Sequence, residues 1–185
     1  MANAAIATRT NPVAGRKFAN SHVQLETAAE AARISFRATS KGAKDFGKTL
    51  GLDLPTGPGK AASKAGRTAI WLGPDEWFII DQKGPIDDLM PKRENAQFSA
   101  TDISHRNVAF DVSGVGAEAT LNGGSPRDLS LAAFPVGSAC RTILGKAEIV
   151  LWRTGRESFR VECWRSFGTY VWELLMEAAK DAHVR

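Results

Sequence analysis

Cysteine and histidine are scarce in this sequence, which has two cysteines and three histidines among 185 residues. Cys140 and Cys163 match neither the CxxC spacing of redox motifs nor the spacing of a zinc-binding pair with histidines close by. Disulfides are rare in a reducing compartment, where an unpaired cysteine packs as a small hydrophobic residue. We therefore predict two reduced, partly buried thiols, no metal site and a cytoplasmic protein.

Long hydrophobic runs and clustered positive charge are also absent from the sequence. Apolar segments such as residues 69–72 and 77–80 are far shorter than the ~20 residues that cross a bilayer, so a membrane-spanning helix is excluded. The net charge of +4 is spread along the chain, and no run of Lys and Arg forms a stripe for phosphates. The sequence therefore predicts neither a membrane nor a nucleic acid as a partner.

The overall composition is that of an ordinary globular domain, with 43% hydrophobic and 24% charged residues. A chain of this length suits one domain, which buries about 70% of the surface that the unfolded chain exposes. We predict a single folded domain over residues 21–180, followed by a short tail over residues 181–185.

Residues 1–20 differ from the rest because they contain no acidic residue and no apolar core of a secretory signal. We predict a flexible basic arm, in which Arg9, Pro12 and Arg16 are candidates for docking on an acidic partner. An organelle transit peptide has a similar composition, so this alternative stays open.

The first half of the domain predicts a strand, a helix, a hairpin and a second helix. An extended segment at residues 34–39 precedes an amphipathic stretch that Ser40 caps and that ends before the glycines and prolines of residues 51–59. Two apolar runs within residues 69–80 flank Gly-Pro-Asp-Glu, whose residue types favour tight turns, and they predict a β-hairpin. A short helix is expected over residues 81–90, behind a proline near its first turn.

The second half predicts the same elements in the same order. Residues 108–112 alternate as a strand does, and a helix follows that a Gly-Gly pair stops. A second hairpin is expected within residues 148–162. The clearest amphipathic helix covers residues 167–178, with Ser166 as its predicted cap.

Two strand-helix-hairpin-helix units, at about residues 30–95 and 105–180, therefore suggest an approximate duplication within one domain. Hairpins dominate, and the long alternation of strands and helices that builds parallel sheets is missing. We predict an α+β fold with antiparallel sheets and helices on one face.

Motifs that carry catalytic or cofactor chemistry are weak in this sequence. His105 follows Asp102 and Ser104, but residues so close together on a turn rarely reach the geometry of a triad, so we interpret them as a polar turn. Residues 57–63 lack the first glycine and the spacing of a P-loop, and the GxG at residues 114–116 extends at best to GxGxxA. We therefore assign no catalytic, cofactor-binding or metal-binding residue.

Five tryptophans give the chain a large aromatic content for burial. Trp164 stands beside Arg165, just beyond a predicted strand, and these two residue types are enriched at interface hot spots. Both are candidates for a subunit interface. The alternative is that Trp164 packs in the core while Arg165 is solvated.

Three segments together resemble the gamma subunit of heterotetrameric sarcosine oxidase: LGPDEWFI at residues 72–79, ACRTILGKAE at residues 139–148 and WRSF at residues 164–167. The resemblance extends over about residues 10–179. It implies a fold similar to the folate-binding domain of aminomethyltransferase, in agreement with the duplicated pattern. It also implies a non-catalytic subunit, because no catalytic residue is assigned to gamma subunits.

The resemblance implies partners and cofactors as well. The alpha, beta and delta subunits would be the partners, with NAD and tetrahydrofolate on alpha, the flavins FAD and FMN on alpha and beta, and zinc on delta. The complex would convert sarcosine to glycine and hydrogen peroxide and pass the one-carbon unit to tetrahydrofolate. An autonomous folate-dependent aminomethyltransferase-like protein and an RNA-binding module are the alternatives.

Overall fold

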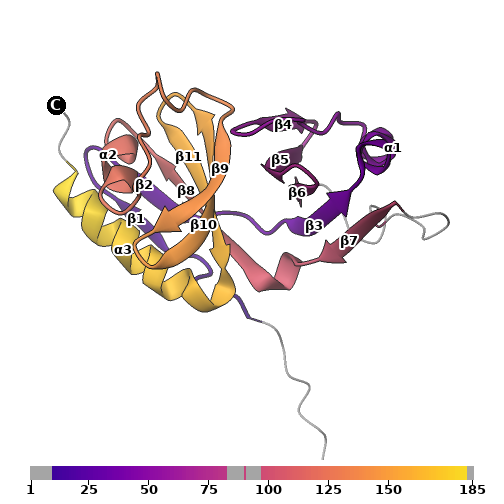
Figure 1. Cartoon of the computed structure of the whole chain (residues 1–185). Coiled ribbons are helices and arrows are strands. Elements are labelled where there is room, and N and C mark those ends of the chain that lie inside the picture. The colour runs from indigo at the N-terminus through magenta and orange to yellow at the C-terminus, as the bar shows by residue number, and fades with distance from the viewer. Residues whose placement is uncertain (1–9, 83–89, 91–96, 183–185) are drawn as a thin grey trace, which may run out of the picture.

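The computed structural model describes residues 10–82, 90 and 97–182, which form two antiparallel sheets and three α-helices. The larger sheet consists, in spatial order, of β1 (Lys17–Ala19), β2 (Gln24–Thr27), β8 (Asn107–Ser113), β11 (Ser158–Trp164), β10 (Ala147–Gly155) and β9 (Ala139–Leu144) (Figure 1). The smaller sheet consists of β4 (Ala61–Lys64), β5 (Arg67–Gly73), β6 (Glu76–Asp81), β3 (Ala32–Ala38) and β7 (Phe98–Asp102). The predicted α+β class with antiparallel sheets is confirmed.

Both predicted hairpins are present. In the smaller sheet β5 pairs antiparallel with β6, and Trp71 lies opposite Trp77. In the larger sheet β10 pairs antiparallel with β11, and Leu151 lies opposite Val161. The register shifts between Arg153 and Gly155, so a bulge adds twist near the second turn.

Helix α1 (Ser40–Leu50) begins one residue before the predicted start. The Thr39 hydroxyl accepts a hydrogen bond from the Gly42 N–H at 3.2 Å, so Thr39 is the cap and the prediction of Ser40 is wrong. The helix ends at Leu50, and Gly51 caps it with a φ of +65° that suits glycine. Of the helix predicted over residues 81–90, Asp81 belongs to β6 and residues 83–89 lie outside the described residues.

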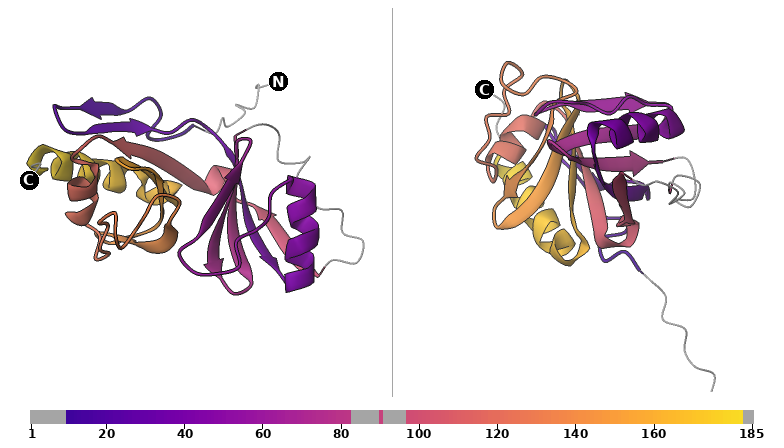
Figure 2. Two further views of the ribbon diagram at one scale, coloured as in Figure 1. Left: turned by 90° about the horizontal axis from the view of Figure 1, so that it is seen from above. Right: turned by 45° about the vertical axis from the view of Figure 1, so that its right-hand side comes forward.

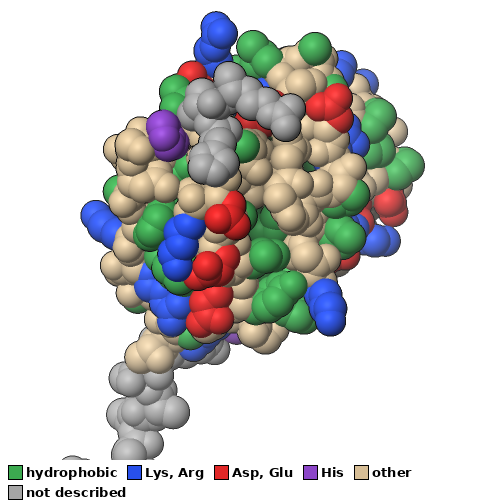
Figure 3. All heavy atoms as spheres, turned by 90° about the vertical axis from the view of Figure 1, so that its left-hand side faces the viewer, with side chains coloured by type: hydrophobic (Ala, Val, Ile, Leu, Met, Phe, Trp, Pro, Cys, Tyr) green, Lys and Arg blue, Asp and Glu red, His purple; other side chains and the backbone are tan. Residues whose placement is uncertain are grey.

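The helices α2 (Ala117–Asn122) and α3 (Gly168–Asp181) pack together on one face of the larger sheet. The buried face of α3 includes Val171, Trp172 and Leu175. Figure 2 shows α1 at the opposite end of the molecule, beyond the smaller sheet, so each sheet carries its helices on one face. The opposite side of α3 mixes acidic and basic side chains at the surface (Figure 3).

A short 3₁₀ turn, η3 (Arg165–Phe167), joins β11 to α3. Ser166 lies inside this turn, and Phe167 precedes α3 without a capping hydrogen bond from its side chain. The prediction of Ser166 as the cap is therefore wrong, because the chain enters α3 through a tighter turn and not from an extended residue. Among the described residues, no helix is long and apolar enough to cross a membrane.

The predicted limits of the domain need correction at both ends. Val13 is 0% exposed in the core and β1 pairs with β2, so residues 10–20 are part of the domain and not of a flexible arm. The Asn20 amide also donates to the Ala179 carbonyl at 2.9 Å. At the other end, α3 includes residue 181 and Ala182 is buried, while residues 1–9 and 183–185 lie outside the described part.

The two sheets pack face to face through a small apolar cluster. The smaller sheet contributes Ile70, Phe78 and Ile80, and the larger sheet contributes Ala139 and Val150. An isolated antiparallel bridge between residues 60 and 138 joins the start of β4 to the segment before β9. The two sheets therefore form one domain with its helices on the outside.

Candidate functional site

Three of the predicted interface residues meet at the point where β11 ends. Pro12, Trp164 and Arg165 line one open cavity of about 640 Å³, although Pro12 is far from the others in sequence. We call this cavity the Trp164 surface, and its lining residues are Pro12, His105, Arg106, Trp164, Arg165, Ser166 and Thr169. Arg16 is not among them, and Arg9 lies outside the described residues.

Alternation along β11 places Trp164 outside the core. Phe159, Val161 and Cys163 face the core of the larger sheet, so Trp164 belongs to the opposite face. Its side chain is 43% exposed, whereas that of Trp172 is 5% exposed. The alternative of core packing for Trp164 is therefore wrong.

Aromatic and cationic side chains gather around Trp164. The Arg106 guanidinium lies over the indole, 4.8 Å from the ring centroid. The Phe167 ring lies 6.4 Å from the indole and is 38% exposed. Arg106 comes from the 3₁₀ turn η2 (Ser104–Arg106), which the sequence pattern did not connect with Trp164. Only the pairing of β8 with β11 brings the two together.

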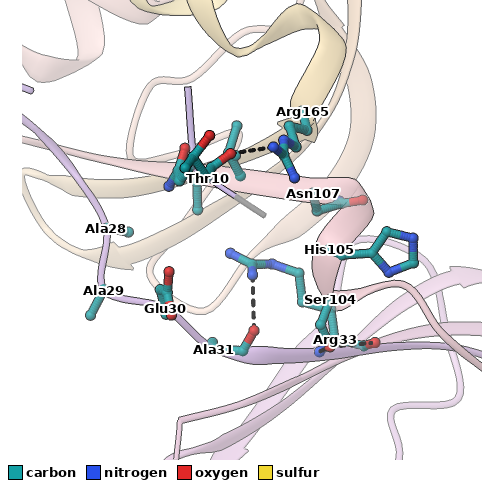
Figure 4. Close-up of a pocket in the computed structure, with 13 residues that line it drawn as sticks. Thr10, Ala28, Ala29, Glu30, Ala31, Arg33, Ser104, His105, Asn107 and Arg165 are labelled. Carbon is teal, nitrogen blue, oxygen red and sulfur yellow. Dashed lines mark hydrogen bonds between the residues drawn. The ribbon is translucent and has the colours of Figure 1, made fainter. Parts of the chain in front are cut away.

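A smaller cavity of about 310 Å³ adjoins the Trp164 surface and shares His105 and Arg165 with it (Figure 4). The Arg165 guanidinium donates a hydrogen bond to the Thr10 carbonyl across the top of this cavity. Beneath them, the Arg33 guanidinium donates to the Ala31 carbonyl at 2.9 Å. The N-terminal segment and the linker between β2 and β3 therefore form its walls.

Arg33 is part of a buried charge network between the two sheets. Its Nε donates to Glu162 Oε2 at 2.6 Å, and the side chains of both residues are at most 5% exposed. Arg160 Nε donates to Glu162 Oε1 at 2.9 Å, and Arg160 Nη1 lies 3.5 Å from Asp111 Oδ1. Burial raises the pKa of Asp111, which Arg160 partly opposes. The Arg33–Glu162 pair joins the two sheets, and Arg160 and Asp111 extend the network within the larger sheet.

The polar turn around His105 has the structural role that its sequence predicts. Asp102 Oδ1 accepts a hydrogen bond from the Ser104 N–H at 2.8 Å. The Ser104 hydroxyl accepts one from the Arg33 N–H at 2.9 Å, so it anchors the turn to β3. His105 is exposed and lines both cavities. The serine is occupied by the backbone, and the three residues do not form a triad.

The glycines that resemble nucleotide-binding motifs serve close packing. A Cβ added to Gly114 would lie 2.3 Å from the His22 carbonyl oxygen, and one on Gly116 would lie 2.8 Å from a Val23 methyl carbon. The chain itself fills the space that a pyrophosphate would need. Residues 57–60 lead into β4, which includes residues 61–63, and not into the helix that a P-loop requires. Neither segment fits a dinucleotide or a nucleoside triphosphate.

Both cysteines are free, as predicted. Burial raises the pKa of Cys163 to about 12, and it also raises the pKa of the half-buried Cys140. Neither thiol has the lowered pKa of a reactive cysteine. Within the described ranges, no three His, Cys, Asp or Glu side chains are grouped so that they could hold a metal ion.

Comparisons with known proteins agree with one another on the family. The model of the sarcosine oxidase gamma subunit family matches residues 30–181. The gamma subunit from Corynebacterium sp. (strain U-96) is 29% identical and covers 97% of this chain and 88% of its own length. That from Arthrobacter sp. is 33% identical over 75% of this chain and 71% of its own length.

Solved structures show the same relationship. A chain of the heterotetrameric sarcosine oxidase from Corynebacterium sp. U-96, in complex with pyrrole 2-carboxylate, superposes with a TM-score of 0.82 at 27% identity, covering 89% of this chain and 88% of that one. The glycine cleavage system aminomethyltransferase T from Bartonella henselae has a TM-score of 0.63 at 14% identity, covers 86% of this chain and 49% of that one, and shows a shared fold. By sequence and by fold, this chain belongs to the sarcosine oxidase gamma subunit family.

Proposed function

We propose that this chain is the gamma subunit of a cytoplasmic, heterotetrameric sarcosine oxidase, assembled with alpha, beta and delta subunits. The observation that carries the proposal is the similarity to a chain of the Corynebacterium complex over nearly the full length of both. The complex oxidatively demethylates sarcosine to glycine, forms hydrogen peroxide and transfers the one-carbon unit to tetrahydrofolate. This chain contributes to the reaction through assembly and not through a reacting group.

The cofactors of the complex are assigned in this proposal to the other subunits, with FAD, FMN, NAD, tetrahydrofolate and zinc all outside this chain. The packing of Gly114 and Gly116 against residues 22 and 23 supports this assignment, because it removes the backbone cradle that a dinucleotide needs. The use of Ser104 as an anchor for β3 supports it further, since it leaves no activated nucleophile beside His105.

The Trp164 surface is the part of the chain that we assign to a subunit interface. Exposed tryptophan beside arginine is the composition of interface hot spots, and Pro12 adds a rigid apolar wall. Arg9 and Arg16, on either side of Pro12 in sequence, are proposed as further charged residues of the same interface. Charges at the edge of an interface affect the rate of association more than its strength.

The order of elements supports an internal duplication at about residues 30–95 and 105–180. In the first unit β3 leads into α1, and the β5–β6 hairpin follows. In the second unit β8 leads into α2, and the β10–β11 hairpin follows. The similarity to aminomethyltransferase T concerns the fold alone, and no observation favours an autonomous transferase.

Co-expression with affinity-tagged alpha, together with beta and delta, tests the proposal. We expect this chain to co-purify in a stable complex that retains flavin and NAD and produces peroxide from sarcosine. The chain purified alone should show neither flavin absorbance nor sarcosine-dependent peroxide. A chain that stays apart from the other subunits and turns over a folate substrate would contradict the proposal.

A further inference from the structure

The Trp164 surface carries positive charge that the described part of the chain leaves without a carboxylate partner. Arg106 is exposed and stacks on the indole, and Arg165 donates to a backbone carbonyl. Neither guanidinium forms an ion pair with any described carboxylate, although many other arginines of the chain do. Around the two adjoining cavities Glu30 is the sole acidic residue among the described lining residues, and it belongs to the smaller cavity.

The apolar part of the same surface is equally unpartnered. Trp164 and Pro12 line the cavity, and Phe167, which is not a lining residue, contacts the Trp164 ring from beside it; Trp164 and Phe167 are 43% and 38% exposed. Burying an indole and a phenyl ring away from water lowers the free energy, so a partner that covered these rings would gain binding energy. The surface is therefore suited to a ligand that presents a carboxylate next to an apolar side chain.

Along α3 the charge changes from positive at the cavity to negative beyond it, which favours a short acidic segment over a long polyanion in this direction. Thr169 lines the cavity, and Glu173 lies one turn further along α3 on the same side of the helix. Glu177 follows after another turn, and both glutamates are exposed. A nucleic acid strand that continued along α3 would meet these carboxylates, whereas a peptide of a few residues would not.

We propose that the Trp164 surface binds an acidic segment of a partner subunit, in which an Asp or Glu pairs with Arg106 and Arg165 and a neighbouring apolar or aromatic side chain packs on Trp164. This inference rests on the proposed function, because it requires a heterotetrameric complex. Beyond the proposed function, the inference specifies the kind of partner segment that this surface binds. Because the first turn of α3 holds no acidic residue, the positive end of the helix dipole contributes a potential of the same sign.

The first experiment compares charge-reversed variants in binding to the tagged complex of the other three subunits. Arg106→Glu and Arg165→Glu should each weaken association by about 5- to 150-fold, which corresponds to about 1–3 kcal/mol. Arg156→Glu is the matched control, because Arg156 is exposed in the turn between β10 and β11, at the other end of β11 from Trp164. Wild-type association should weaken markedly between about 50 mM and about 300 mM salt, and the Glu variants should show a smaller dependence on salt.

The second experiment detects the partner carboxylate directly and does not depend on loss of binding. Arg106→Lys and Arg165→Lys keep the charge and introduce an amine at each position. Carbodiimide treatment of the assembled complex should join the introduced lysine to an Asp or Glu of a partner subunit through an amide bond, with loss of water. Mass spectrometry would identify that segment, and the wild-type complex should lack this cross-link.

Three outcomes would overturn the inference. If both charge-reversed variants bind as tightly as Arg156→Glu, the surface is not an acidic docking site, while the proposed function stands. If neither lysine variant forms a cross-link in an assembled complex, the surface is again not an acidic docking site, and the proposed function is unaffected. If wild-type chain instead binds a single-stranded oligonucleotide and Arg106→Glu abolishes only that binding, the ligand is a nucleic acid. Failure of the wild-type chain to join the other subunits would refute the proposed function itself.

Discussion

Arg33 of β3 and Glu162 of β11 join the two sheets through a buried ion pair with a distance of 2.6 Å between Nε and Oε2. Glu162 also accepts from Arg160, so one carboxylate serves two guanidinium groups. The pair connects residues that are far apart in sequence and fixes the position of the smaller sheet against the larger one. Arg33 also lines the smaller cavity, and its main chain anchors the turn that carries His105 and Arg106.

Replacement of Arg33 should therefore destabilise the domain strongly. Arg33→Ala leaves Glu162 buried with less compensation, and we expect a loss of about 3–5 kcal/mol in the free energy of unfolding. Arg37→Ala, on the same strand, is the control, because that side chain is 59% exposed in its pair with Glu76 and should matter by less than about 1 kcal/mol. Denaturant unfolding of both variants measures the difference, and equal effects would contradict a special role for the buried pair.

Removal of the N-terminal segment should unfold the domain partly and not simply weaken assembly. Val13 is 0% exposed in the main core, and Val13→Ala should lose part of the about 1.5–3 kcal/mol that burial of a whole valine contributes. Deletion of residues 1–20 also removes β1 and should have a larger effect. Lys17→Ala, at an exposed position of β1, serves as the control. Thermal melting distinguishes this expectation from an independent arm, whose deletion would leave the midpoint unchanged.

Gly114→Ala should destabilise the domain by at least about 2 kcal/mol. The reason is twofold, because Gly114 has a φ of +107° and a Cβ would lie 2.3 Å from the His22 carbonyl oxygen. Gly57→Ala tests the same chemical change where nothing lies within 4 Å and φ is not positive. Denaturant unfolding of the two variants gives the comparison. If Gly114→Ala unfolds with the same free energy as Gly57→Ala, the turn at Gly114 can move to accommodate a Cβ.

Cys163 should resist alkylation at neutral pH in the folded protein and react once the protein unfolds. Its pKa of about 12 lies above the ordinary value of 9.0, chiefly through burial. As the pH rises, the unfolded chain therefore loses the Cys163 proton before the folded chain does. The stability that the protonated, buried thiol contributes is fully present below about pH 9 and is lost as the pH rises toward 12. The slope from this group is at most about 1.4 kcal/mol per pH unit. Cys163→Ala should show a shallower decline, and an identical decline would exclude the thiol as its cause.

Arg165→Ala should weaken assembly more than it weakens folding. Arg165 is half-buried and bonds to the Thr10 carbonyl, so the change in the free energy of unfolding should stay within about 1 kcal/mol. Association with the other subunits should lose about 1–3 kcal/mol if the residue is a hot spot. The measurement is co-purification beside a thermal melt of the same variant, and normal assembly would mark Arg165 as an ordinary surface residue.

Local sequence patterns were sufficient to predict the hairpins and helices of this protein, and short sequence segments were sufficient to indicate its family. Alternating apolar residues with turn-forming residues between them predicted both hairpins, and helical spacing predicted α3 to within a few residues. These features depend on residues close together in the chain, so composition and periodicity report them. The errors at Ser40 and Ser166 are shifts at helix ends, where a neighbouring residue or a tighter turn satisfies the same N–H groups.

Tertiary structure alone decided how the candidate site is assembled and where the domain begins. Pro12, Arg106 and Trp164 meet because β8 pairs with both β2 and β11, and the partners of such pairings are distant in sequence. The same pairing buries Val13, whose polar surroundings in sequence suggested a flexible arm. Periodicity assigns a face to each side chain, but the burial of apolar surface across distant strands selects which faces come together.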